Sequence, residues 1–423
     1  MNHYRVWGIA AVLLAGAPAG FPQERSGMTL RVTEALAHGG RTVRLVCFGD
    51  SITGVYYHTG GRRAWPEMLG IALQRLYPAA RIEVTNAGIS GDTTAGGLGR
   101  IEADVLKHAP DLVVVMFGMN DVTRVPPDAY RANLRQIVDR CRAGGAEVIL
   151  CTPNSIHDGD PARPASKLAS YADLVREVGG EAQVPVADCY AAYESIRARD
   201  ARAWMMLMSE TIHPNMRGHR VFAEEVAWVI SGHRVSLRDV PPLLPGLPHC
   251  LERLDAGKPL RVTAMPPYDG LIGPALRRVR PQAQVEVKRW ETAGLSLADI
   301  EDQAKARGWM GIQGAPPEAR PDLVVIAVPA GATATDADDY YQRYSWVLNW
   351  SLSFGRLEWD CVALLPSVAQ PELNHAEQTT EDLALEVVQG QDIPYLRRSP
   401  GDHTPTAVLL TRWLKQQTLT PPG

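Results

Sequence analysis

The sequence predicts a doubly wound α/β fold with a parallel central sheet. Short runs in the first half are continuously apolar rather than alternating, as expected for central strands that helices cover on both faces. Between these runs, apolar residues recur every three or four positions, which is typical of amphipathic helices. Alternation of the two patterns indicates βαβ units, in which neighbouring strands are parallel.

The elements follow in order along residues 28–235, the predicted first domain. Strands are expected at 43–48, 82–85, 112–117, 148–151 and 184–187. Covering helices are expected at 65–76, 128–141, 171–178 and 221–230. Parallel strands bring their carboxyl ends to one edge of the sheet, where α/β proteins collect their ligands. Polar residues just after a strand are therefore the first candidates for a site.

Length and composition are those of a globular protein with more than one domain. The chain has 423 residues, of which 45% are hydrophobic and 21% charged, with 43 Lys and Arg against 47 Asp and Glu. At roughly 150 residues per domain, two or three domains are expected. A nucleic-acid-binding surface usually carries a basic excess, so no nucleic-acid partner is expected.

The N-terminus has the pattern of a secretory signal peptide. Arg5 precedes an apolar run at 6–17 that ends in the small residues of segment 17–19. We expect residues 1–19 to be removed on export, which gives a secreted or periplasmic protein. Pro18 would soon end the alternative, an apolar N-terminal helix. The run is short for a bilayer span, so no integral membrane segment is expected after its removal.

A proline-rich linker at 236–250 separates two halves with similar patterns. The segment PDLVVV at 110–115 recurs as PDLVVI at 321–326, each at the start of a predicted central strand. Other segments agree in order, namely 82–84 with 285–287, 173–178 with 382–387, and the closing helix with 407–414. These repeats predict that residues 251–420 are a degenerate copy of the first domain. Chance similarity among strands rich in Val, Ile and Leu is the alternative.

Four polar segments fall at the ends of predicted elements. Gly49-Asp50-Ser51 follows the first strand, and the others are NAGISGDTT at 86–94, GMND at 118–121 and ETIHPN at 210–215. The first is weak alone, because Asp and Ser commonly cap helices in such turns. No G-x-S-x-G elbow surrounds Ser51, so an α/β-hydrolase is not supported. Together and in this order, the four segments strongly resemble the SGNH hydrolase superfamily, the GDSL-type esterases, over residues 42–232.

The resemblance implies a flavodoxin-like, three-layer α/β/α fold and a serine esterase site. It makes Ser51 the nucleophile and His213 the general base, with the Ser51 N–H, Gly91 and Asn120 as the oxyanion hole. The chemistry suits these residue types, because a hydroxyl attacks efficiently only when a base takes its proton. A glycine N–H and a neutral amide are suitable donors to the developing oxyanion. No cofactor and no metal are implied, and the acidic segment 157–160 is expected to be a solvated loop.

The acidic partner of the histidine departs from the family pattern. The position three before His213, usually Asp, is Glu210 here. Glutamate has the same charge on one more methylene, so it can complete a triad if the backbone adjusts. The alternative is a dyad of Ser51 and His213.

Several other residues have two interpretations. His58 and Arg62 are weak candidates for lining the substrate pocket, and a surface position is the alternative for His58. His219 is expected on the surface of a helix. The six cysteines form no C-x-x-C pair, and Cys47 and Cys151, in or at the end of predicted core strands, are expected to be free, buried thiols, with a disulfide as the alternative. The i, i+4 pairs Tyr340 with Tyr344 and Trp346 with Trp350 predict a buried aromatic stripe, with glycan contact as the alternative.

The second half lacks the predicted nucleophile. When the two halves are aligned, Ser51 falls near Tyr268, Asn120 aligns with Gly331 and Glu210 aligns with Pro400. Gly91 and His213 have counterparts of the same type, Gly294 and His403. A base without a hydroxyl cannot form an acyl-enzyme, so this half is expected to be silent. Packing on the first half and shaping of the substrate groove are its two candidate roles.

These observations predict an exported serine esterase that hydrolyses short, acetyl-type esters, with a small molecule or a glycan as substrate. No long apolar insertion resembling a lipase lid follows Ser51, and the candidate lining residues are polar. A lysophospholipase or other lipid acyl hydrolase is one alternative. A catalytically impaired binding or scaffold protein is the other.

Overall fold

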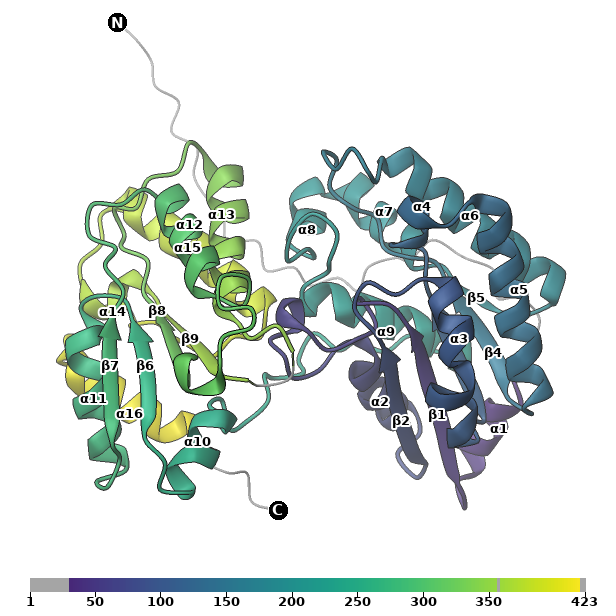
Figure 1. Cartoon of the computed structure of the whole chain (residues 1–423), viewed down its shortest axis with the longest axis horizontal. Helices are drawn as coiled ribbons and strands as arrows, with labels where there is room; N and C mark the ends of the chain where they lie inside the picture. The colour runs from purple at the N-terminus through teal and green to yellow at the C-terminus, as the bar shows by residue number, and fades with distance from the viewer. Residues whose placement is uncertain (1–29, 356–357, 419–423) are drawn as a thin grey trace, which may run out of the picture.

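The computed structural model describes residues 30–355 and 358–418, and the predicted signal peptide lies outside them. Two parallel five-stranded sheets, each with helices on both faces, form two domains (Figure 1). The predicted α/β architecture is confirmed. Within the described residues, no helix is long and apolar enough to cross a membrane.

The first sheet has the strand order β2-β1-β3-β4-β5. Its strands are β1 (Thr42–Gly49), β2 (Arg81–Gly88), β3 (Leu112–Met116), β4 (Glu147–Cys151) and β5 (Val186–Ala187). Gly49 pairs with both Gly88 and Met116, so three strands end at the same edge. All five predicted strands are confirmed, and β5 is shorter than expected because Pro185 has no N–H to donate to the ladder.

The helices cover this sheet as right-handed crossovers require. They are α1 (Arg31–His38), α2 (Trp65–Leu76), α3 (Thr94–Asp104), α4 (Asp121–Arg124), α5 (Pro127–Ala143), α6 (Ala165–Ala182), α7 (Cys189–Arg199), α8 (Ala201–Met205) and α9 (Met216–Ser231), with 3-10 turns η1 (Tyr57–Thr59) and η2 (Leu106–His108). Helix α2 packs on α9, whereas α3, α5 and α6 pack side by side (Figure 1). The four predicted helices are confirmed as α2, α5, α6 and α9.

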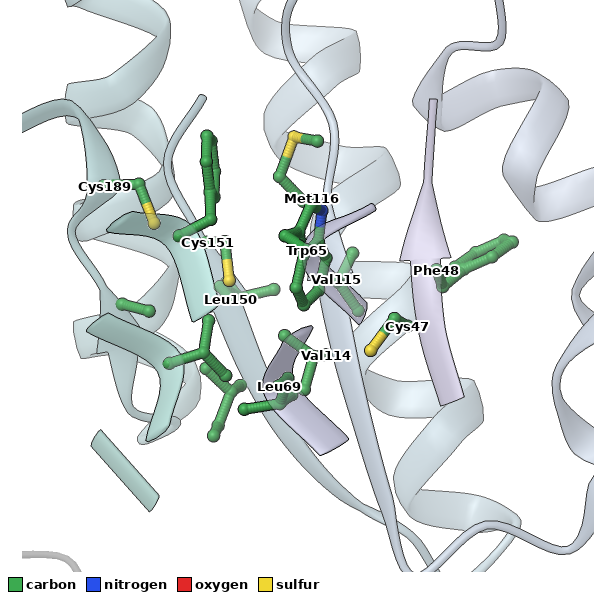
Figure 2. Packing of buried hydrophobic residues seen from close by; sticks show 14 of the residues in the cluster. Cys47, Phe48, Trp65, Leu69, Val114, Val115, Met116, Leu150, Cys151 and Cys189 are labelled. Atoms are coloured by element: carbon green, nitrogen blue, oxygen red, sulfur yellow. The ribbon is translucent and has the colours of Figure 1, made fainter. Parts of the chain in front are cut away.

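The central strands β1, β3 and β4 are buried on both faces, which explains their continuous apolar runs. Figure 2 shows successive residues Cys47 and Phe48 of β1 pointing to opposite faces, with Leu69 of α2 beside Val114 of β3. All four of these side chains are fully buried. All six cysteines are free and buried, which confirms the prediction for Cys47 and Cys151.

The second sheet, read from β7, has the order β7-β6-β8-β9-β10, which repeats the relative order of the first. Its strands are β6 (Leu260–Ala264), β7 (Val285–Arg289), β8 (Leu323–Ile326), β9 (Asp360–Leu364) and β10 (Tyr395–Leu396). Its helices are α10 (Pro248–Asp255), α11 (Tyr268–Val279), α12 (Leu297–Arg307), α13 (Ala337–Ser351), α14 (Pro366–Ala369), α15 (His375–Gly390) and α16 (Thr406–Gln417), with the 3-10 turn η3 (Pro317–Ala319). Helix α10 begins inside the predicted linker, because proline is favoured in the first helical turn.

The two PDLVV segments play the same structural part in their domains. The Arg44 N–H of β1 donates to Asp111 Oδ2 at 2.9 Å, and the Arg261 N–H of β6 donates to Asp322 Oδ2 at 2.8 Å. Each aspartate thereby ties the start of its strand to the neighbouring strand. That both domains arose by duplication of one unit stays a prediction, and the matching roles of these two aspartates support it.

The predicted aromatic stripe on α13 is confirmed. Tyr340 and Tyr344 are buried and stacked at 5.6 Å between ring centroids. Trp346 and Trp350 stack at 4.7 Å on the same helix. The stripe therefore packs within the second domain and, through Trp346, stacks on Tyr57 of the first domain.

Candidate active site

Ser51 lies in a tight turn at the carboxyl edge of the first sheet. The N–H groups of Thr53 and Gly54 both donate to the Asp50 carbonyl at 3.1 Å, and the Ile52 N–H donates to Asp50 Oδ1 at 3.0 Å. Gly49 is required before this turn, because a Cβ there would lie 2.3 Å from the Met116 carbonyl oxygen of β3. These contacts hold the nearly buried Ser51 side chain in one place.

A hydrogen-bonded chain joins Ser51, His213 and Glu210. Ser51 Oγ lies 2.8 Å from His213 Nε2. When the hydroxyl donates to Nε2, the imidazole proton resides on Nδ1 and donates to Glu210 Oε1. Residues from the turn after β1 and from the loop before α9 thus form the serine, histidine and carboxylate arrangement.

The longer glutamate reaches the histidine by folding back on its own loop. Glu210 Oε1 accepts from the His213 N–H at 2.9 Å, and Oε2 accepts from the Ile212 N–H at 3.1 Å. Burial by itself would raise the pKa of Glu210, but the charge of His213 and these hydrogen bonds lower it overall. The group is therefore a carboxylate at neutral pH.

Asn120 and Gly91 lie on the two loops beside this chain. The nearly buried Asn120 donates one Nδ2 hydrogen to the Asp92 carbonyl at 3.0 Å, which leaves its second amide hydrogen for a ligand. Gly91 has φ of 74°, a left-handed conformation that favours glycine. Arg124 donates to the Gly91 carbonyl at 2.6 Å, so the loop is held in this conformation.

We expect Asn120→Ala to lower kcat by about 10²–10³-fold, because one preorganised donor to the oxyanion is lost. KM should change little, since this donor acts mainly on charge that develops in the transition state. Steady-state kinetics of the variant beside Asn374→Ala, which removes an amide from the N-cap of α15, would measure the effect. An equal loss of kcat in both variants would show that Asn120 is not an oxyanion-hole donor.

Two buried carboxyl groups below the site have structural contacts. Asp121 Oδ1 accepts from the Thr94 N–H at 2.9 Å, which joins the loop after β3 to the start of α3. Burial raises the pKa of Asp121 and raises that of Asp50 to about 7. Asp50 therefore stabilises the turn after β1, and Asp121 the loop after β3.

The structure corrects the surface positions considered for His58 and His219, whereas the lining of a substrate pocket by Arg62 stays a prediction. His58 is fully buried and stacks on the His213 ring, with centroids 4.5 Å apart and planes at 13°, so it lies behind the base rather than lining a pocket. His219 stacks on the other face of His58 and accepts from the Trp65 N–H at 3.1 Å, which explains why it is buried. Burial lowers the pKa of both groups, that of His219 to about 3, so both are neutral. Arg62 Nη1 donates to the Leu243 carbonyl of the linker at 2.7 Å.

Sequence reasoning missed Tyr57, which follows Ser51 on η1. Its hydroxyl lies 3.3 Å from His213 Nδ1, and its ring meets the imidazole edge to face at 5.8 Å. No motif identifies this tyrosine. Its closeness to Ser51 along the chain is the only sequence signal.

Two other features lie apart from this site. A cavity of about 470 Å³ is bounded by β6, β7 and α12 of the second domain, so it is distinct from the Ser51 region. Segment 157–160 is a loop, and Asp160 pairs with Arg163 at 2.7 Å. In the described part of the chain, no group of three His, Cys, Asp or Glu side chains could hold a metal.

A parallel α/β domain with this hydrogen-bonded chain at its carboxyl edge defines a serine ester hydrolase. The family model for the GDSL-like lipase/acylhydrolase family matches residues 47–221. An acetylxylan esterase from Geobacillus stearothermophilus is 31% identical over 165 residues, which cover 36% of this chain and 73% of that protein. The chain therefore belongs to the GDSL-like lipase/acylhydrolase family.

Two further matches concern the same domain. Thioesterase 1/protease 1/lysophospholipase L1 from Escherichia coli K12 is 36% identical over 107 residues, which cover 25% of this chain and 49% of that protein. The crystal structure of a lipase/acylhydrolase from Enterococcus faecalis is 29% identical, covers 46% of this chain and 99% of that chain, and has a TM-score of 0.39.

Proposed function

We propose that this protein is an exported esterase that removes acetyl-type groups from carbohydrate through an acyl-serine intermediate. The observation that carries the proposal is the chain from Ser51 Oγ through His213 to Glu210, with Asn120 and Gly91 beside it. Arg5 and the apolar run at 6–17 support export.

In the first half of the reaction, Ser51 Oγ attacks the ester carbonyl carbon while His213 Nε2 takes the hydroxyl proton. The carbonyl oxygen becomes an oxyanion, which accepts hydrogen bonds from the Ser51 and Gly91 N–H groups and the Asn120 amide. Glu210 stabilises the imidazolium. His213 then protonates the leaving alcohol, and an acyl ester on Ser51 remains.

In the second half, water takes the place of the alcohol. His213 Nε2 accepts a proton as the water oxygen attacks the acyl carbon, and the same donors stabilise the second oxyanion. Collapse of this intermediate returns the proton to Ser51 Oγ and releases the carboxylic acid. Neutral His58, stacked on the base, adds no charge that would oppose formation of the imidazolium.

The choice of substrate rests on the relatives and on the chain itself. The acetylxylan esterase relative supports an acetylated glycan, and the chain has no long apolar insertion resembling a lid after Ser51. Two observations favour a lipid substrate. The large apolar side chain of Ile89, on the loop that carries Gly91, is 43% exposed, and the E. coli relative is named a lysophospholipase. An acyl-length series separates the two classes.

We expect the purified protein to hydrolyse p-nitrophenyl acetate and butyrate with a kcat/KM at least tenfold above that for the octanoate. We also expect it to release acetate from acetylated xylo-oligosaccharide. Ser51→Ala, measured beside it, gives the background rate. A kcat/KM that rises with chain length would favour the lipid acyl hydrolase. Acetate release from the nitrophenyl ester alone would contradict the carbohydrate substrate.

A further inference from the structure

The second domain contacts the candidate active site through a stack of aromatic rings. Tyr57, whose hydroxyl is 3.3 Å from His213 Nδ1, stacks on Trp309 of the second domain with centroids 5.2 Å apart and planes at 24°. Trp309 packs in turn on Trp350 of α13 at 4.7 Å. Burial raises the pKa of Tyr57 well above its usual value, so the phenol is neutral and can accept from Nδ1–H beside Glu210.

A second set of contacts returns from Trp309 to the loop that carries Glu210. Trp309 Nε1 donates to the Asn349 carbonyl at 3.0 Å, and Asn349 Nδ2 donates to the Ser209 carbonyl at 2.9 Å. The Ser209 N–H donates to the His213 carbonyl at 2.9 Å. Asn349 and Ser209 are fully buried, so water does not compete for these bonds.

The contacts therefore form a closed ring, which runs from His213 through Tyr57, Trp309, Asn349 and Ser209 back to His213. Three of its members belong to the catalytic domain and two to the second domain. Within the ring, Tyr57 is the titratable residue that contacts the second domain. Glu210 is not a member of the ring but is hydrogen-bonded to His213.

Further bonds fix the two domains at this place. Tyr341 of α13 donates its hydroxyl to the Met205 carbonyl at 2.6 Å, just before the Glu210 loop. On the other side, Asp392 accepts from Arg63 at 2.8 Å and from Arg220 at 3.0 Å, and all three side chains are largely buried. Several hydrogen bonds and ion pairs therefore stabilise the interface between the two domains.

We propose that the second domain is a working part of the active site, in which Trp309 and Asn349 act as positioning residues for His213 and Glu210. The proposal rests on the proposed function and goes beyond it, because it gives the silent domain a role in turnover. A base must meet the serine hydroxyl and the leaving oxygen within a narrow range of geometry, and a misplacement of about 1 Å can cost roughly 10²-fold in rate. Closure of the ring on both sides of His213 limits such movement.

The test compares Trp309→Ala, Asn349→Ala and Tyr57→Phe with the unchanged protein. Trp309→Phe, which keeps a ring against Tyr57, is the conservative variant. Trp228→Ala is the matched control, because it removes a half-exposed tryptophan of α9 that stacks with Arg234, away from the ring. Two readouts are taken for each protein, namely kcat and KM on p-nitrophenyl acetate, and the downfield proton NMR signal of His213 Nδ1–H, assigned by its loss in His213→Gln.

We expect Trp309→Ala and Asn349→Ala to lower kcat at least tenfold with KM changed less than threefold, and to shift or broaden the His213 signal. Tyr57→Phe should shift the signal while its ring still stacks. Trp309→Phe, which keeps the ring against Tyr57 but loses the Nε1 bond to Asn349, should have a kcat between those of Trp309→Ala and the unchanged protein. Wild-type kcat together with an unchanged signal in both alanine variants would overturn the proposal. If the wild type hydrolyses no ester, the proposed function fails, but the NMR signal still decides the positioning role. Should Trp309→Ala not fold, the smaller Tyr57→Phe and Asn349→Ala changes decide it.

Discussion

Replacing Ser51 by alanine is expected to lower kcat by about 10⁶-fold on any ester the protein hydrolyses. Without Oγ no acyl-enzyme forms, and only the oxyanion donors and substrate binding remain to assist direct attack by water. The melting temperature should change little, because the lost hydroxyl is bonded to His213 alone among the described side chains.

Two measurements check this result. Steady-state rates of Ser51→Ala are compared with those of Ser170→Ala, which removes an exposed hydroxyl from α6 and should be fully active. Intact mass spectrometry after rapid quenching should detect an acyl adduct on the unchanged protein and none on Ser51→Ala. Residual activity above about 1% would place the nucleophile elsewhere.

Glu210→Gln is expected to lower kcat by about 10⁴-fold with little change in KM. With its carbonyl in the place of Oε2, glutamine still accepts from the Ile212 N–H, but its amide nitrogen then stands in the place of Oε1, against the His213 N–H and Nδ1. This amide donates toward Nδ1 and favours the tautomer that carries the proton on Nε2. That tautomer cannot accept the proton of Ser51, and the imidazolium loses its neighbouring negative charge.

Kinetics of Glu210→Gln beside Glu210→Asp would check this prediction. Aspartate restores the charge and the usual family residue, so it should retain far more activity than glutamine, limited by the shorter reach to His213. Thermal unfolding of both variants separates a loss of turnover from a loss of stability. Equal activity of Glu210→Gln and the unchanged protein would leave a dyad of Ser51 and His213 as the mechanism.

Local pattern was sufficient for the strands, and the resemblance of four polar segments to a known family supplied the candidate catalytic residues. A fully buried strand must be apolar along its whole length, so β1, β3 and β4 are visible in the sequence. Ser51, Gly91 and Asn120 follow β1, β2 and β3 in the chain, and parallel strands necessarily bring such residues to one edge.

Helix α3 shows why other elements were not predicted. Its segment TAGGLGRIEAD contains three glycines, which weaken any helical preference. The tertiary structure requires one of them, because a Cβ on Gly97 would lie 2.9 Å from the Phe117 ring and 3.1 Å from that of Phe48. Close packing on the sheet therefore stabilises a helix that local propensity disfavours.

For this protein, the sequence by itself determined the two α/β halves and the order of the strands' polar ends, since these follow from burial pattern and chain order, while its resemblance to a known family supplied the serine, histidine and oxyanion candidates. Only the tertiary structure decided that Glu210 reaches His213, that His58 and His219 stack behind the base, and that Trp309 meets Tyr57. Such contacts depend on loop conformation and on how two domains pack. The hydrophobic periodicity of the sequence predicts neither the loop conformation nor the packing of the domains.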